Sequence, residues 1–190
     1  MSISSMWVWA SCSERTRAAL LAAVLLAGGT TVQAKLFLSQ EQALDLAFGG
    51  EAAVERQSHF LTADQVARAR ALAGPGVQVE GALVTRYVGR KDGRVLGTAY
   101  FDTHRVRTLP ETLMIVVGPE GKVTRVEVLT FGEPDAYLPR PAWYGQFQGR
   151  ALDRELAVSR GIHGVTGATL SGRAATEAVR RTLALHQVLP

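Results

Sequence analysis

Four consecutive segments between residues 81 and 131 constrain the fold of this chain more than any other feature. Residues 81–90, 94–104, 112–118 and 122–131 are rich in β-branched and aromatic side chains. The turn sequences Lys-Asp-Gly and Gly-Pro-Glu-Gly separate the first pair and the last pair, as they do in β-hairpins. In the last segment Val126 and Val128 alternate with Arg125 and Glu127, which indicates one buried and one solvated face. The pattern predicts an antiparallel meander.

Helical patterns flank the predicted sheet. Residues 39–50 begin with a capping box of Ser39 and Gln42, and residues 60–74 begin with one of Thr62 and Gln65. Apolar residues recur at helical spacing over residues 171–186. Prolines bar a long helix or a central strand from residues 132–160, which predicts a stiffened loop that either binds a ligand or is pinned to the core. We therefore expect an α+β fold, with an antiparallel β-sheet, flanking helices and a closing helix.

The N-terminus has the order of a secretory signal peptide. Arg15 and Arg17 precede an apolar run over residues 18–27, and small residues lead to a predicted cleavage site after Ala34. The run is shorter than the roughly 18 apolar residues that a membrane span needs. We expect residues 1–34 to be a signal peptide, residues 35–79 to be an N-terminal helical segment, and the mature protein to be periplasmic. The only cysteine, Cys12, lies in the signal, so the mature chain has no disulfide.

Residues 164–173, Gly-Val-Thr-Gly-Ala-Thr-Leu-Ser-Gly-Arg, form a bare, hydroxyl-rich turn ahead of the last helix. A helix N-terminus presents free N–H groups to anions, and glycines let the backbone approach a ligand closely. The turn lacks the lysine of a P-loop, and the chain after Gly167 is too short for a dinucleotide-binding fold. The turn therefore predicts either a phosphate site or simply a hydroxyl cap of the helix.

The stretch Thr166-Gly167-Ala168-Thr169 resembles the (Ser/Thr)-Gly-Ala-Thr motif of the FMN-binding domain family. This family includes the C subunit of the sodium-translocating NADH:quinone oxidoreductase, the G subunit of the Rnf complex and the nitrous-oxide-reductase regulators. The family's other segments are similar in kind and order to Glu133-Pro134 and to residues 143–149, Trp-Tyr-Gly-Gln-Phe-Gln-Gly. The resemblance covers residues 80–186, and it implies that residues 80–190 are an FMN-binding domain.

The resemblance also implies how the cofactor is attached. In the family a flavin transferase uses FAD to esterify the last threonine of the motif with the FMN phosphate, and the matching residue here is Thr169. Two departures bear on this attachment. His163 stands where the family usually has an acidic residue, and the threonine of a Glu-Thr-Pro stretch is missing after Glu133.

Three aromatic residues, Tyr137, Trp143 and Phe147, are either walls for the flavin ring, because flat rings stack, or ordinary core residues. The residues expected to bind the cofactor are Thr166, Gly167, Ala168, Thr169, Leu170, Ser171, Glu133, Tyr137, Trp143, Phe147 and His163.

These observations lead us to expect an exported FMN protein that relays electrons between a membrane redox protein and a periplasmic or membrane partner. In this interpretation the protein is a carrier rather than an enzyme with its own substrate. Two alternatives remain: a cofactor-free binding or scaffold module of the same fold, and a flavin reductase with a small-molecule acceptor. Scattered basic residues argue against a nucleic-acid partner.

Other polar residues carry weaker signals. The histidines lack metal-ligand spacing, so we expect no metal site and place them at the surface or at helix ends. No catalytic serine–histidine–acid set is readable, and the arginines of the last helix are expected to face water. The histidines are His59, His104, His163 and His186. The arginines are Arg173, Arg180 and Arg181.

Overall fold

The computed structural model of the chain describes residues 34–190. The signal peptide predicted from Arg15, Arg17 and the apolar run lies outside the described residues. Among residues 34–190, no helix combines the length and apolarity that crossing a membrane would require.

A six-stranded antiparallel sheet forms the centre of the structure, with the spatial order β1-β6-β5-β4-β3-β2. The expected meander is confirmed, because the four predicted segments are the consecutive neighbours β3 to β6. The two outer strands were not predicted. The strands are β1 (Lys35–Leu36), β2 (Ala53–Phe60), β3 (Leu83–Lys91), β4 (Arg94–Arg105), β5 (Pro110–Val117) and β6 (Val123–Phe131).

The edge strand β2 has a sequence, Ala-Val-Glu-Arg-Gln-Ser-His-Phe, in which most positions are exposed. An edge strand that packs little on either face lacks the apolar alternation by which a half-buried strand is recognised. Residues 35–79, expected as a helical segment, therefore supply both outer strands of the sheet. Residues 34–190 belong to one compact unit.

The helices begin where their capping residues predict. Both predicted capping boxes are present, at Ser39 with Gln42 and at Thr62 with Gln65. The closing helix begins two residues earlier than expected. The helices are α2 (Gln40–Phe48), α3 (Ala63–Ala73), α4 (Pro141–Tyr144) and α5 (Thr169–Val188), with 3₁₀ turns η1 (Asp135–Tyr137) and η2 (Gly145–Phe147).

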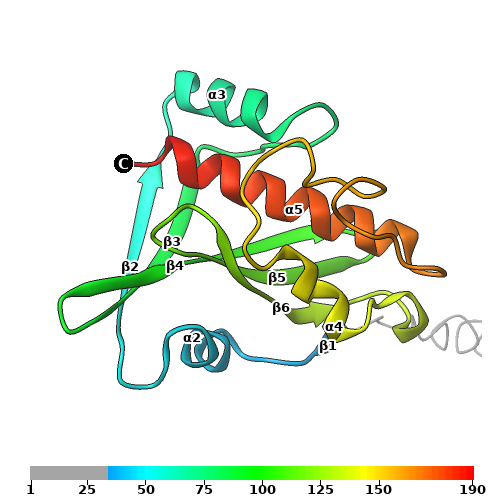
Figure 1. Cartoon of the computed structure of the whole chain (residues 1–190), viewed down its shortest axis with the longest axis horizontal. Coiled ribbons are helices and arrows are strands. Elements are labelled where there is room, and N and C mark those ends of the chain that lie inside the picture. Colours follow the sequence, from blue (N-terminus) through cyan, green and yellow to red (C-terminus); the bar gives the residue numbers. More distant parts are fainter. Residues whose placement is uncertain (1–33) are drawn as a thin grey trace, which may run out of the picture. The chain divides into compact units, whose positions relative to one another are not determined.

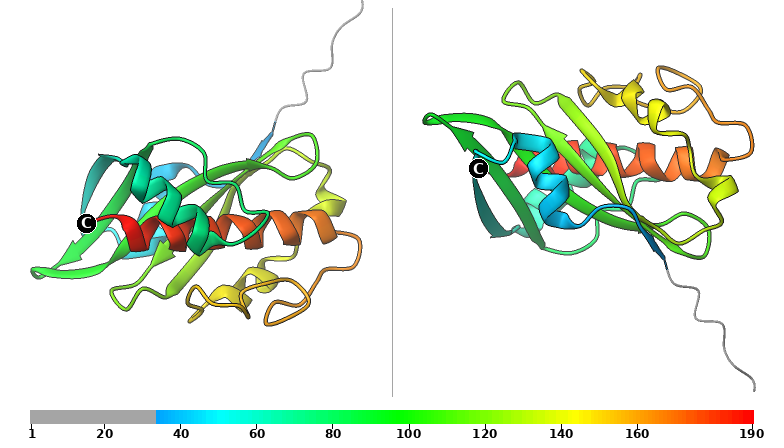
Figure 2. Two further views of the ribbon diagram at one scale, coloured as in Figure 1. Left: turned by 90° about the horizontal axis from the view of Figure 1, so that it is seen from above. Right: turned by 90° about the horizontal axis from the view of Figure 1, so that it is seen from below.

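The helices cover both faces of the sheet (Figures 1 and 2). Helix α5 packs on one face against β4 and β5, and α3 packs against α5. Helix α2 covers the opposite face, where a Cβ atom at Gly89 would lie only 2.4 Å from the Phe48 ring. Glycine at this position thus lets α2 approach the sheet. The fold is α+β with flanking helices, as expected.

Residues 132–168 connect β6 to α5 mostly without regular structure, as the prolines predict. Pro141 is the first residue of the four-residue helix α4, a position that tolerates proline. Tyr144, Phe147, Leu156 and Ile162 from this connection are buried in the core between the sheet and α5. The connection is therefore pinned to the domain along its length and brings the turn at residues 164–168 to the start of α5.

Candidate functional site: the turn before the closing helix

The start of α5 presents free backbone donors. Ala168 is the N-cap residue and supplies no side-chain hydrogen bond. The first backbone N–H of this region to bond into the helix belongs to Gly172, which donates to the Ala168 carbonyl. Within the described residues, the N–H groups of Thr169, Leu170 and Ser171 donate to no protein acceptor. The interpretation of the turn as a hydroxyl cap is therefore wrong, and the helix end keeps its capacity to bind an anion.

The threonines of the turn are open to solvent. Thr166 and Thr169 are both exposed. The Thr169 hydroxyl lies 3.4 Å from the Val165 carbonyl oxygen, a long contact that leaves its oxygen accessible. Gly167 has a φ of 82°, and a Cβ atom there would meet nothing within 4 Å, so space around the turn is unfilled. A bulky group can reach Thr169 from this side.

The two residues after Thr169 have different roles. Leu170 is 46% exposed, which leaves an apolar surface beside the threonine. The Ser171 side chain is buried and donates a 2.5 Å hydrogen bond to the Tyr137 carbonyl. Ser171 thus ties the connection after β6 to the helix start, and its hydroxyl is already engaged within the protein.

Trp143 links the turn to α5. Its indole N–H donates to the His163 carbonyl at 2.7 Å, and its ring packs so closely on the helix that a Cβ atom at Gly172 would lie 3.2 Å from it. The ring is half-buried, so part of its surface remains accessible. The His163 backbone N–H donates to Gln146 Oε1 at 2.8 Å, while the His163 residue is exposed. These bonds fix the course of the chain that leads to Thr169.

The other two candidate ring walls differ from each other. Tyr137 is half-buried, and the Arg107 guanidinium lies 5.5 Å from the centre of its ring. Phe147 is completely buried and contacts Trp143 edge-on in the main core. The expectation that Phe147 lines the flavin ring is not supported, because core packing leaves none of its surface open. Phe147 instead packs edge-on against the Trp143 ring from within the core.

Glu133 holds a loop rather than facing an open site. Its Oε1 atom accepts hydrogen bonds from the backbone N–H groups of Thr108 and Leu109, at 2.8 and 2.9 Å, in the turn between β4 and β5. These backbone hydrogen bonds, that of Thr108 first, hold the pKa of Glu133 below its usual value. Glu133 therefore fixes the loop that carries Arg107 toward Tyr137.

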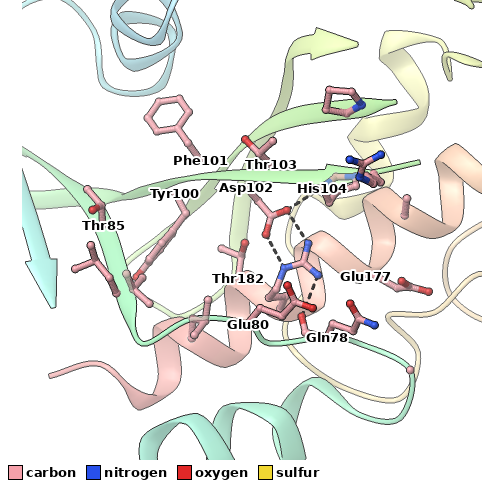
Figure 3. A pocket seen from close by; sticks show the side chains of 18 residues that line it. Gln78, Glu80, Thr85, Tyr100, Phe101, Asp102, Thr103, His104, Glu177 and Thr182 are labelled. Carbon is pink, nitrogen blue, oxygen red and sulfur yellow. Dashed lines mark hydrogen bonds and ion pairs between the residues drawn. The ribbon is translucent and has the colours of Figure 1, made fainter. Parts of the chain in front are cut away.

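A second polar constellation lies between the sheet and α5, and the sequence analysis missed it. His104 Nδ1 lies 2.9 Å from Asp102 Oδ1, and His104 Nε2 lies 3.1 Å from Glu111 Oε2. Carboxylate oxygens only accept, so both ring nitrogens donate and the imidazole is a cation. Asp102 also pairs with Arg181 at 2.6 and 2.7 Å, and Tyr144 donates to Glu111 at 3.1 Å. We call these five residues the buried ionic network; Figure 3 shows its Asp102 end.

Burial and the hydrogen bonds of this network shift the pKa values of its residues. Burial alone lowers the pKa of His104, but hydrogen bonds to Asp102 and Glu111 outweigh burial and raise it to about 9. Burial alone raises the pKa of Asp102, yet hydrogen bonds from His104 and Arg181 hold it below its usual value. Burial, assisted by the Glu111 charge, raises the pKa of Tyr144. Near neutral pH the network therefore consists of the His104 cation, the Tyr144 phenol, the Asp102 and Glu111 carboxylates and the Arg181 guanidinium.

One signal in the sequence could have pointed to this network. Asp102 and His104 are two residues apart on one strand, so they share a face. Glu111 is the register partner of His104 on β5. Arg181, expected to face water, is half-buried against Asp102. The spacing within β4 was readable, whereas the pairing with Glu111 and Arg181 depends on register and helix docking.

The network forms part of the wall of a cleft of about 850 Å³ between β3, β4 and α5 (Figure 3). Asp102, His104 and Arg181 line this cleft, while Glu111 and Tyr144 lie behind them. Ala174, Glu177 and Arg181 lie along one side of α5, and Leu170 begins the same helical stripe. The cleft thus runs along the same side of α5 as Leu170, toward the C-terminal end of the helix.

The geometry defines a class of protein: an α+β domain whose closing helix starts with exposed threonines and free N–H groups. Three unpaired backbone donors, unfilled space at Gly167 and an accessible hydroxyl at Thr169 fit the phosphate end of FMN. The comparisons with known proteins agree. Residues 109–184 match the FMN-binding domain family.

This part of the chain is therefore similar to the FMN-binding domain family, and the match supports FMN as its cofactor. The matched residues run from the turn before β5 into α5, and they include Glu133, Trp143 and Thr169. A search of curated proteins found no match to the chain.

Proposed function

We propose that this protein is an exported electron carrier whose FMN is attached through a phosphoester to Thr169. One observation carries the proposal: Thr169 is the first residue of α5, its hydroxyl is accessible, and the neighbouring N–H groups have no protein acceptor. A phosphodiester formed there keeps one negative charge, which the free N–H groups and the helix dipole stabilise. Bound FMN supplies the redox chemistry, and the chain supplies its position.

Export supports a covalent attachment. The predicted signal peptide would deliver the protein to a compartment from which a dissociated cofactor is not easily replaced. The redox partners in this proposal are a membrane redox protein and a periplasmic or membrane acceptor, and a flavin transferase loads the cofactor. The exposed Leu170 and the half-buried Trp143 beside Thr169 offer apolar surface to a flavin ring.

The attachment is tested by producing the full chain together with a flavin transferase and examining the denatured protein on a gel. We expect flavin fluorescence in the band of the native sequence and in Thr169→Ser, which retains a hydroxyl. Thr169→Ala should give a dark band. Thr124→Ala is the control, because Thr124 is an exposed threonine of β6 outside the expected site and its loss should leave the band fluorescent.

Each contrary outcome has a definite meaning. A fluorescent Thr169→Ala band would show that another residue carries the flavin. Yellow native protein that gives a dark denatured band would show that FMN binds without a covalent bond. Export is tested separately, by finding whether the N-terminus of protein recovered from the periplasm begins at Lys35.

A flavin reductase with a small-molecule acceptor is the second candidate, and the cleft of about 850 Å³ beside α5 favours it. The cleft offers room for an organic acceptor, and the polar side chains in its wall could orient one. Sustained turnover of the loaded protein with soluble acceptors, and without a protein partner, would favour this function over the carrier.

A further inference from the structure

A second cleft lies next to the first along α5, shares Glu177 with it and is lined by four arginines. It has a volume of about 610 Å³ and is enclosed by the end of α3 and the residues after it, by residues 154–160, and by α5. The arginines come from two of these walls: Arg154 and Arg160 from the loop, Arg173 and Arg180 from the helix. We call it the arginine cleft.

Arg180 forms the fixed part of the arginine cleft. Its guanidinium donates to the carbonyls of Ala73 and Asp153, both at 2.7 Å, and to that of Leu156 at 3.0 Å. These bonds join the end of α3 to the loop, so Arg180 does not face water freely as its helical position had suggested. All three acceptors are neutral carbonyls, and the positive charge of this half-buried side chain is left without a carboxylate partner.

One nitrogen of the Arg180 guanidinium lies beside Gly74. The Nη2 atom donates to no acceptor in the described part of the chain, and a Cβ atom at Gly74 would lie 3.2 Å from it. Gly74 has a φ of 90° at the end of α3, so glycine is required there by the backbone as well. The absence of a side chain at Gly74 leaves this N–H donor open to a ligand.

The other arginines add uncompensated charge. Arg154, Arg160 and Arg173 are exposed, and none of the four arginines forms an ion pair within residues 34–190. Glu177 is the single carboxylate among the residues that line the cleft. Like charges gathered on one surface repel each other, and a multivalent anion removes this repulsion.

The chemistry of the donors indicates which anion fits. Guanidinium groups present paired N–H donors that match phosphate oxygens, and a recess shared by several arginines suits a group with more than one negative charge. We propose that the arginine cleft is a binding site for a phosphate-bearing ligand, separate from the FMN attachment at Thr169. Free phosphorylated metabolites and phospholipid headgroups share this chemistry.

The position of the cleft bears on its relation to the flavin. Thr169, Arg173, Thr176 and Arg180 lie on one stripe of α5, so the cleft begins about one helical turn from the attachment residue. A ligand held there would lie close to the redox cofactor without occupying the free N–H groups at the helix start. Binding of such a ligand would therefore affect the flavin.

Calorimetric titration with inorganic pyrophosphate tests the proposal, using full-length mature protein prepared with and without FMN. We expect saturable binding of one pyrophosphate that weakens with added NaCl. The double variant Arg154→Gln/Arg173→Gln should lose at least tenfold in affinity. These two side chains make no hydrogen bonds in the described structure, so the variant should unfold like the native protein in urea. Arg90→Gln/Arg94→Gln, at exposed positions of the β3–β4 hairpin, is the control with the same loss of two positive charges.

Further measurements distinguish a lipid headgroup from a soluble ligand and define the results that would overturn the proposal. Cleft-dependent binding to phosphatidylglycerol vesicles, but not to phosphatidylcholine vesicles, would identify a lipid headgroup; pyrophosphate binding without vesicle binding would identify a soluble ligand. If added FMN displaces pyrophosphate, or FMN-loaded protein no longer binds it, the cleft holds the flavin's own phosphate and the separate site is overturned. Equal affinity in the cleft variant and in Arg90→Gln/Arg94→Gln would also overturn it. Thr169→Ala should leave pyrophosphate binding intact, so failure of the attachment proposal is measured independently.

Discussion

Raising the pH from 7 to 9.5 should weaken the fold because His104 then loses its proton. In the folded protein the pKa of His104 is raised from 6.5 to about 9, since both ring nitrogens donate to carboxylates. A group whose folded pKa is raised stabilises the fold most below its unfolded pKa, and this contribution disappears as the pH passes through the folded value. Deprotonation leaves Asp102 and Glu111 with one donor fewer between them.

The size of the effect follows from the two pKa values. The full difference corresponds to roughly 3 kcal/mol, and the part lost between pH 7 and pH 9.5 is about 2 kcal/mol. The side chain of His104 is only 11% exposed, so solvent screening removes little of this. Other shifted groups titrate outside the window: the pKa of Tyr100 is raised to about 12, those of Asp102 and Glu133 are lowered, and that of His186 lies below 6.5.

The assay is urea unfolding at several pH values between 7 and 9.5, followed by circular dichroism. The native sequence should lose about 2 kcal/mol across this range, whereas His104→Gln should start less stable and show a much flatter profile. His163→Gln, at an exposed histidine, is the control and should follow the native profile. Equal slopes for the native protein and His104→Gln would refute the assignment of an imidazolium between the two carboxylates. The proton NMR titration of the His104 ring gives the folded pKa directly.

Two further substitutions test how the turn before α5 is supported. Phe147→Ala should destabilise the protein by about 3–5 kcal/mol in urea unfolding, because a fully buried ring is removed from the core; a loss below 1 kcal/mol would show that the ring is not core. Glu133→Gln should cost about 1–2 kcal/mol at pH 7, because the charged acceptor of the Thr108 and Leu109 N–H groups is lost. That cost should shrink as the pH falls below 4.5 toward the lowered pKa of Glu133, where the native carboxylate is protonated too; a pH-independent cost would contradict the role of its charge.

Much of the fold could be predicted from the sequence because interactions between residues close together in the chain determine it. The hairpin turns between β3 and β4 and between β5 and β6, and both capping boxes, act over a few residues and need no knowledge of distant contacts. The edge strand β2 was not readable, because its place in the sheet is fixed by pairing with β3 rather than by an apolar pattern of its own.

The features of the candidate site divide in the same way, into those set by local sequence and those set by tertiary structure. The sequence by itself showed a stretch, residues 166–169, that resembles the motif of the FMN-binding domain family, and placed it ahead of a helix. It could do so because the resemblance rests on consecutive residues and the helical pattern that follows is local. Only the tertiary structure decided which hydroxyls are free: Ser171 is engaged by Tyr137, whereas Thr169 remains accessible. It alone also placed His104 between Asp102 and Glu111, and Arg180 between α3 and the loop at residues 153–156. These contacts join residues from 2 to 107 positions apart, and strand register and helix docking, rather than local sequence, bring most of them together.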